Sequence, residues 1–147
     1  MLMLQCWIIF NLAATLGLAQ IEKVDKIIKR RIEKSKYLTK RLNEETDEIE
    51  TSSLPKGHKH VYQLYSLLAN SRDELIDYLS SKGISSKIYF DPVHLSNFYT
   101  EKLKYDCKLP VTEELAKKTI TLPMFPSITT EEIDYIASSI GKFYNDR

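Results

Sequence analysis

The residues most suited to bind a metal are two of the three histidines, His58 and His60. On a strand, two residues that are two positions apart point to the same face, because successive side chains alternate between faces. A protein metal site usually takes three or four ligands. Neither a cysteine nor a carboxylate stands near this pair in the sequence, so we predict no metal site.

The third histidine, His94, lies in the segment Phe90-Asp91-Pro92-Val93-His94, directly after a predicted strand. Loop residues at strand ends often contact ligands. The alternative is a local role, in which the histidine forms a hydrogen bond within its own loop. The residues alone leave both roles open, a ligand contact and a local hydrogen bond.

The sequence offers no residue that we predict to be catalytic. Cys6 and Cys107 have no CxxC partner and no histidine at metal-ligand spacing, so we interpret them as reduced structural thiols. The chain contains neither a GxGxxG or Walker-type phosphate loop nor a GxSxG nucleophile elbow.

The composition is that of a globular protein with one domain. The chain has 147 residues, of which 43% are hydrophobic and 28% charged, and its net charge is +1. A charge this balanced gives no field that would attract nucleic acid or an acidic membrane surface. The basic run at residues 29–31 has no interleaved aromatic residues and reads as a solvated helix face.

The first nineteen residues are apolar and end in Gly17-Leu18-Ala19, which looks like a signal-peptide cleavage site. However, no Lys or Arg precedes Ile21, and a signal peptide needs a basic start. The run is also marginal for a membrane span, which needs about 20 apolar residues. We expect a cytoplasmic chain without a membrane segment, and export with cleavage of residues 1–19 is the alternative.

A long helix is predicted from Leu12 to Asn43, with Asn11 as its N-cap. Its apolar residues recur at helical spacings of three and four: Ile21, Val24, Ile28, Ile32, Leu38 and Leu42. Residues 46–59 then form a polar connector that contains Pro55 and Gly57.

The spacing of the apolar residues is no longer helical after the connector. His60 to Leu68 is rich in aromatic and β-favouring residues and predicts a strand. Ser71 and Glu74 form a capping-box pair that opens a helix, and Gly83 stands where a left-handed C-cap belongs. Residues 84–90 predict a second strand, which Asp91-Pro92 ends.

The last third alternates irregular and regular segments. We expect a loop with a short helix over residues 93–105, a segment from Pro110 with Thr112 as N-cap and Leu115 buried, and a strand over residues 119–122. Residues 123–126 are expected to be irregular, and a capping box of Thr129 and Glu132 opens a final helix through Ile140.

The order of these elements predicts an α/β (α+β) fold, in which a long helix precedes a small sheet with helices packed on it. If the first two strands are parallel neighbours, their connection would cross over right-handedly.

Several segments together resemble the DegT/StrS family of pyridoxal-phosphate-dependent sugar aminotransferases. Residues 11–45 resemble its long interdomain helix, and His60-Val-Tyr-Gln-Leu-Tyr65 resembles the first strand of its small domain. Tyr89 to His94 resembles its substrate loop, and Thr121-Leu-Pro-Met-Phe-Pro126 its last strand and turn. The matches imply four parts: an unmatched apolar N-terminus at residues 1–10, the helix at 11–45, the connector at 46–59 and a small α/β domain at 60–147.

The resemblance implies a dimeric aminotransferase in which a lysine Schiff base carries an amino group to a keto-sugar nucleotide. His94 would contact that substrate by a hydrogen bond, and Tyr89 is a weaker contact. The family's cofactor lysine, however, lies in a large domain that this chain does not contain. Cys6 and Ile8 also stand where the family has an asparagine and an arginine before its long helix.

We therefore expect no catalytic or cofactor-binding residue here, and an aminotransferase fragment that is inactive alone. Its partner would be a large-domain chain or a second copy, which would pack on the helix over residues 12–43. The alternative function is a non-catalytic interaction module that uses the same helix, and a secreted domain is a third.

Overall fold

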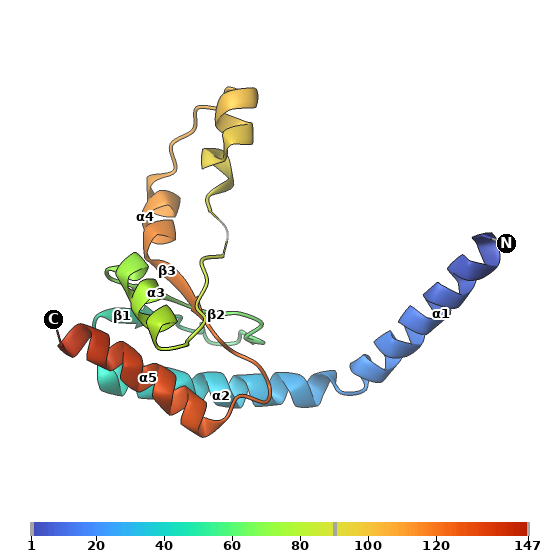
Figure 1. Cartoon of the computed structure of the whole chain (residues 1–147), viewed down its shortest axis with the longest axis horizontal. Coiled ribbons are helices and arrows are strands. Elements are labelled where there is room, and N and C mark those ends of the chain that lie inside the picture. The colour runs from blue at the N-terminus through green and yellow to red at the C-terminus, as the bar shows by residue number, and fades with distance from the viewer. Residues whose placement is uncertain (1, 90, 147) are drawn as a thin grey trace.

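The computed structural model describes the backbone of residues 2–89 and 91–146 and the side chains from residue 11 onward. It begins with two helices, α1 (Leu2–Ile21) and α2 (Val24–Glu45), where the sequence predicted one. Figure 1 shows α1 projecting at an angle to α2. It projects from the packed part of the chain, residues 24–89 and 110–146, which we call the body.

The prediction of a single helix is wrong because the chain turns at Glu22 and Lys23. The Lys23 N–H donates to the Gln20 carbonyl at 3.0 Å, a spacing of three residues instead of four. No proline or glycine marks this turn, and the apolar stripe runs through it, so periodicity alone does not reveal it. Asn11 lies inside α1 and is not an N-cap; its carbonyl accepts a hydrogen bond from the Thr15 hydroxyl at 2.8 Å.

The sheet has three antiparallel strands in the order β1 (Ile49–Thr51), β2 (Tyr65–Ala69), β3 (Thr119–Leu122). The β3 prediction is confirmed. The connector prediction missed β1, whose three residues are too few to show a pattern. The right-handed crossover that parallel neighbouring strands would require does not occur, because both pairs of neighbouring strands are antiparallel.

Two predicted strands are shorter than expected or missing. Residues 60–64 are irregular, since Tyr62 has a φ of 49° and the carbonyls of Tyr62 and Gln63 accept from Arg31 and not from a neighbouring strand. Residues 84–89 form only an isolated bridge between Lys87 and Thr121. The end of that predicted strand, at residue 90, lies outside the described residues.

Helix α3 (Arg72–Ser81) ends as predicted but begins differently. Gly83 has a φ of 75° and donates to the Ser80 carbonyl, while the Ile84 N–H donates to the Leu79 carbonyl at 2.9 Å. This is a Schellman C-cap with glycine in the left-handed position. The predicted capping box is wrong, because Ser71 itself adopts a left-handed φ of 52° and makes no side-chain cap bond.

Helices α4 (Pro110–Lys118) and α5 (Thr130–Asn145) complete the fold. The N-cap of α4 is Leu109 and not Thr112, because Pro110 already occupies the first turn, and Leu115 is 44% exposed instead of buried. In α5 the capping box of Thr129 and Glu132 is confirmed.

Helices α2, α3 and α5 cover one face of the sheet, and α4 lies at its other side (Figure 1). Alternate β2 residues point into the core. The largest fully buried side chains come from these helices, from β3 and from the turn before α5: Leu38, Leu42, Leu75, Leu79, Ile120, Ile128, Ile133 and Ile140. The predicted α/β (α+β) class is confirmed.

Residues 91–109, which we call the arm, project from the sheet and return to it at α4 (Figure 1). The arm contains a 3₁₀ turn at Val93–Leu95 and a π turn at Phe98–Lys102, in agreement with the predicted loop and short helix. Over the described residues, no helix is long and apolar enough to cross a membrane.

Candidate functional site

His94 lies at the base of the arm, in the 3₁₀ turn, and is 9% exposed. Its Nε2 is 3.1 Å from Oε1 of Glu113, which stands in the first turn of α4. The same Glu113 oxygen accepts the backbone N–H of Leu109 at 3.0 Å. The structure therefore brings His94 to a carboxylate that also binds the last residue of the arm.

Charge and hydrogen bonding favour an ionised Glu113. The hydrogen bond with His94 and then the one from the Leu109 N–H hold the pKa of the Glu113 carboxyl below its usual range. The carboxylate also stands near the N-terminus of α4, where the helix dipole favours negative charge. Because an ionised carboxylate only accepts hydrogen bonds, Nε2 of His94 must carry a proton.

Tyr89, the other sequence-predicted contact, lies before the arm and is 39% exposed. It lines a hollow of about 270 Å³ with Gln63 and Leu64, which precede β2, and with Lys87 and Met124. The bridge between Lys87 and Thr121 holds this segment beside β3. Tyr89 thus faces a different surface from the His94–Glu113 pair.

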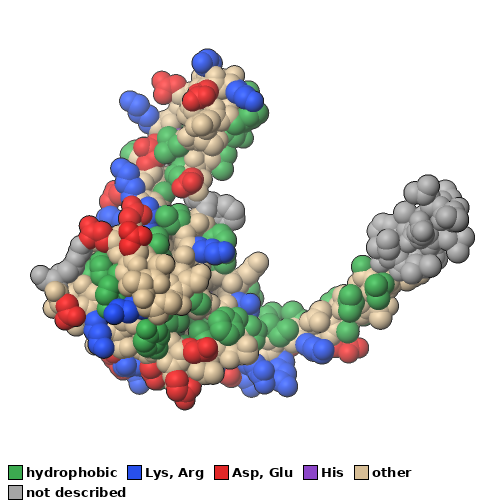
Figure 2. Space-filling view, in the orientation of Figure 1, with side chains coloured by type: hydrophobic (Ala, Val, Ile, Leu, Met, Phe, Trp, Pro, Cys, Tyr) green, Lys and Arg blue, Asp and Glu red, His purple; other side chains and the backbone are tan. Residues whose placement is uncertain are grey.

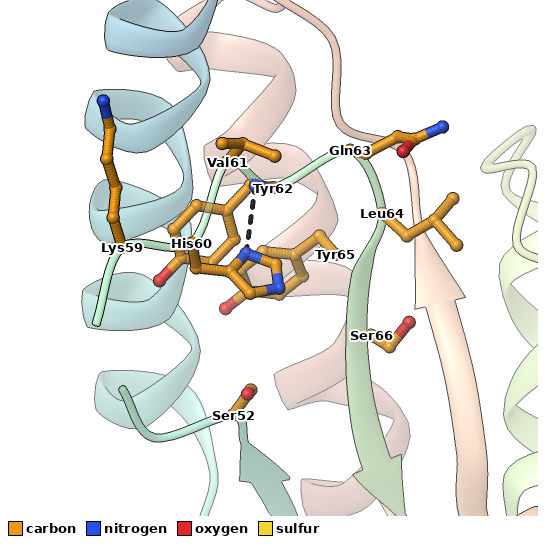
Figure 3. Close-up of a pocket in the computed structure, with 9 residues that line it drawn as sticks. All are labelled: Ser52, Lys59, His60, Val61, Tyr62, Gln63, Leu64, Tyr65 and Ser66. Atoms are coloured by element: carbon orange, nitrogen blue, oxygen red, sulfur yellow. Dashed lines mark hydrogen bonds between the residues drawn. The ribbon is translucent and has the colours of Figure 1, made fainter. Parts of the chain in front are cut away.

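A larger hollow, of about 410 Å³, forms where residues 59–64 enter β2 (Figure 3). The rings of His60, Tyr62 and Tyr65 lie together there, with 4.3 Å between the His60 and Tyr62 centroids. Lys59 and Ser66 also line it. The hydroxyl of buried Tyr65 lies 2.6 Å from that of Thr39 on α2, and burial raises the pKa of Tyr65 to about 12.

His60 is held by its own turn. Its Nδ1 accepts the Tyr62 backbone N–H at 3.0 Å, as the dashed line in Figure 3 shows. His58 instead has Nδ1 3.4 Å from the Lys56 carbonyl. The two histidines therefore do not share a strand face, because this segment is not a strand. Among the described residues, no three His, Cys, Asp or Glu side chains are grouped so as to hold a metal ion.

Sequence reasoning missed the residues that shape these hollows. Arg31 donates from Nη1 to the carbonyls of Tyr62 and Met124, each at 2.9 Å, and so joins α2 to both hollows. In the sequence, nothing distinguishes Arg31 from the other basic residues of the predicted helix. The aromatic residues after the connector also favour a strand, so the sequence predicts a strand where the structure has this hollow.

Cys107 is half-buried in the arm and forms no disulfide with any described residue. Cys6 lies outside the residues whose side chains are described. The two hollows are lined by hydrogen-bonding groups and aromatic rings together with aliphatic side chains such as Val61, Leu64 and Leu122. They suit contact with a ligand that has polar and apolar parts.

The sequence profile of the DegT/DnrJ/EryC1/StrS aminotransferase family matches residues 8–141. The chain is 36% identical over 146 residues to GDP-perosamine synthase of Escherichia coli O157:H7, with 93% of the chain and 37% of that protein covered. It is 28% identical over 134 residues to dTDP-4-dehydro-2,3,6-trideoxy-D-glucose 4-aminotransferase of Saccharopolyspora spinosa, with 90% and 34% covered.

Among solved structures, a DegT DnrJ EryC1 StrS aminotransferase from Brucella abortus superimposes with a TM-score of 0.76 at 28% identity. The superposition covers 86% of this chain and 33% of that one. The chain thus spans about a third of the length of these relatives.

Proposed function

Because the chain belongs to the DegT/DnrJ/EryC1/StrS aminotransferase family, we propose that it forms the small-domain part of an enzyme that aminates a keto-sugar nucleotide. The family resemblance read from the sequence is confirmed. The observation that carries the proposal is the profile match over residues 8–141, since the curated relatives include sugar aminotransferases. The assignment of residues 11–45, the end of α1 together with α2, to an interdomain segment and of 60–147 to a small domain is part of this proposal.

Pyridoxal phosphate, the cofactor that the family implies, would supply the electron sink for amino-group transfer. The described residues do not fit it. A Schiff-base lysine has to stand in an enclosed site, whereas none of the described lysines is buried. Lys59 and Lys87 line hollows, but both side chains are exposed. We propose that the cofactor is held by another part of the enzyme and that this chain is inactive alone.

The partner in this proposal is a large-domain chain, with a second copy of this chain as the other candidate. Exposed apolar side chains on α1 support it: Leu12, Leu16, Leu18 and Ile21 are each at least 59% exposed. Figure 2 shows hydrophobic side chains on the described part of α1 and, beside charged ones, along the arm. Apolar surface of this extent favours association.

Within the assembled enzyme, we propose Tyr89 as a contact to the sugar nucleotide, whereas the His94 side chain faces another surface, where it binds Glu113. Tyr89 is supported by its exposure and its place in a hollow with polar neighbours. A dimer and a cytoplasmic location belong to the same proposal.

The exposed face of α1 also favours a second candidate function, that of a non-catalytic interaction module. Self-association without any cofactor would support the module. An aminotransferase activity that appears only with a large-domain chain would support the enzyme fragment.

A cofactor titration tests the proposed function. Pyridoxal phosphate and borohydride are added to the purified chain, and we expect no single lysine to be trapped. A chain that supplies the rest of the E. coli GDP-perosamine synthase is then added, and we expect amination of the keto-sugar nucleotide. If the 147-residue chain alone traps one lysine and aminates the sugar, the fragment proposal is overturned.

A further inference from the structure

We propose that His94 is a positioning residue that, through Glu113, locks the base of the arm. This inference rests on the proposed function only for its consequence in catalysis, because the lock itself can be measured on the isolated chain. Of the two roles that the sequence left open for His94, the geometry points to the internal one, with a bond to α4 and not to its own loop.

The lock is a three-centre contact on one oxygen atom. Oε1 of Glu113 accepts from His94 Nε2 at 3.1 Å and from the Leu109 N–H at 3.0 Å. His94 stands near the start of the arm and Leu109 at its end, with residues 95–108 between them. One carboxylate on a helix thus fixes both ends of the loop at once.

The burial pattern shows why this contact matters for the arm. His94 is 9% exposed, whereas its neighbours Val93 and Leu95 are 61% and 50% exposed. Farther out, the arm is organised by its own contacts, such as the Tyr105 N–H donating to the Tyr99 carbonyl at 2.8 Å. The tip therefore holds its shape locally, while its direction relative to the sheet depends on the base.

The lock requires a hydrogen-bond donor at the position of His94 Nε2. Nε2 must carry the proton, because Glu113 is an acceptor, and this same atom would have to leave Glu113 before it could bind a substrate. A glutamine at position 94 offers an N–H donor at a similar reach. A leucine has a similar volume but offers no donor and would leave the carboxylate with the Leu109 N–H and without its side-chain partner.

The first test is hydrogen exchange by mass spectrometry on the full 147-residue chain. In H94L we expect amides within residues 95–109 to exchange about tenfold faster, the effect of losing one hydrogen bond to a charged group. In H94Q we expect exchange close to that of the wild type. H58Q serves as the matched control, since His58 lies on the exposed connector away from the arm.

Two results would overturn the lock: unchanged arm exchange in H94L, or arm exchange in H94Q as fast as in H94L. A double variant H94L/E113A should exchange no faster than E113A alone, because both changes remove the same contact; additive effects would contradict it. If H94L fails to fold, E113A still decides, since loss of the shared acceptor must then speed the exchange of the arm amides, and unchanged exchange would overturn the lock.

The consequence for catalysis is tested by measuring aminotransferase activity after a large-domain chain is added. We expect H94L to lose activity and H94Q to keep most of it. Equal losses in both variants would assign His94 to a direct substrate contact and overturn the proposal. A wild-type mixture with no activity would instead count against the proposed function, and the exchange result would stand independently.

Discussion

A single glycine sets how closely α2 and α5 approach each other. A Cβ atom on Gly141 would lie 2.9 Å from both Cβ and Oε2 of Glu45. Glu45 cannot move away without cost, because its other carboxylate oxygen binds Arg41 at 2.8 Å. Residue volume at this one position is therefore coupled to a salt bridge on the neighbouring helix.

Replacing Gly141 with alanine should destabilise the protein. Alanine gains about 1 kcal/mol of helix propensity, but overpacking costs about 1–3 kcal/mol, so we expect a net loss of about 1 kcal/mol. Urea unfolding measures it. Gly17→Ala is the control, because a Cβ there has open space within 4 Å, and an equal loss in both variants would contradict the packing argument.

The carboxylate of Asp134 on α5 binds two side chains of α2. Arg41 Nε donates to it at 2.8 Å and the Tyr37 hydroxyl at 2.9 Å, and the bond with Arg41 is the main cause that lowers the pKa of Asp134. A carboxyl with a lowered folded pKa stabilises the fold above its unfolded pKa of about 4 and loses that contribution as the pH falls through the folded value.

We therefore expect the free energy of unfolding to decrease as the pH is lowered below about 4, and to decrease less steeply in Asp134→Asn. The asparagine variant should already be less stable than the wild type at pH 7, because it accepts a weaker hydrogen bond from Arg41. Urea midpoints across this pH range test it. Parallel curves for the two proteins would show that Asp134 has no part in the acid response.

Two segments carry the same capping-box pattern, and only one forms it. Thr129 adopts an extended conformation with a φ of −82°, and its hydroxyl accepts the Glu132 N–H at 3.1 Å. Ser71 follows β2 after one residue, Asn70, and adopts a left-handed conformation, in which its side chain makes no cap bond. The helix start is therefore decided by the path that the preceding segment takes.

The two positions predict different costs for the same substitution. Thr129→Ala should destabilise the protein by about 1 kcal/mol, because it removes a formed N-cap bond. Ser71→Ala removes no cap bond and should cost clearly less. Thermal and urea unfolding of both variants measure the difference, and a Ser71 variant that loses as much as the Thr129 variant would refute this account.

The whole molecule combines a packed body with two projections, α1 and the arm (Figure 1). The described half of α1 exposes its apolar side chains, and the core residues come from other elements. Helix stability in proteins comes mostly from packing of an apolar face, so we expect α1 to pack against a partner.

Substituting Leu12, Leu16 and Leu18 with glutamine should reduce self-association without weakening the body. We expect more monomer by analytical ultracentrifugation and a free energy of unfolding, measured with urea, within about 0.5 kcal/mol of the wild type, as for surface changes away from the core. Substituting Leu38 with alanine is the contrast and should cost about 2–5 kcal/mol, because that side chain is fully buried. A large loss in the triple variant would show that α1 packs on the body.

The sequence determined the features that depend on local chemistry. Residue periodicity placed α5 and β3, and glycine at position 83 marked the end of α3, because only glycine adopts a positive φ at little cost. The family was also readable, since its motifs recur in order along the chain.

Only the tertiary structure decided what depends on distant partners. Arg31 takes the carbonyls before β2 and so shortens a predicted strand, and Glu113 takes Nε2 of His94 across the base of the arm. The break between α1 and α2 and the three-residue β1 likewise carry no local signal. In each case the physical reason is the same: the decisive hydrogen bond or packing contact joins residues that are far apart in the sequence, or it is absent where periodicity alone would place it.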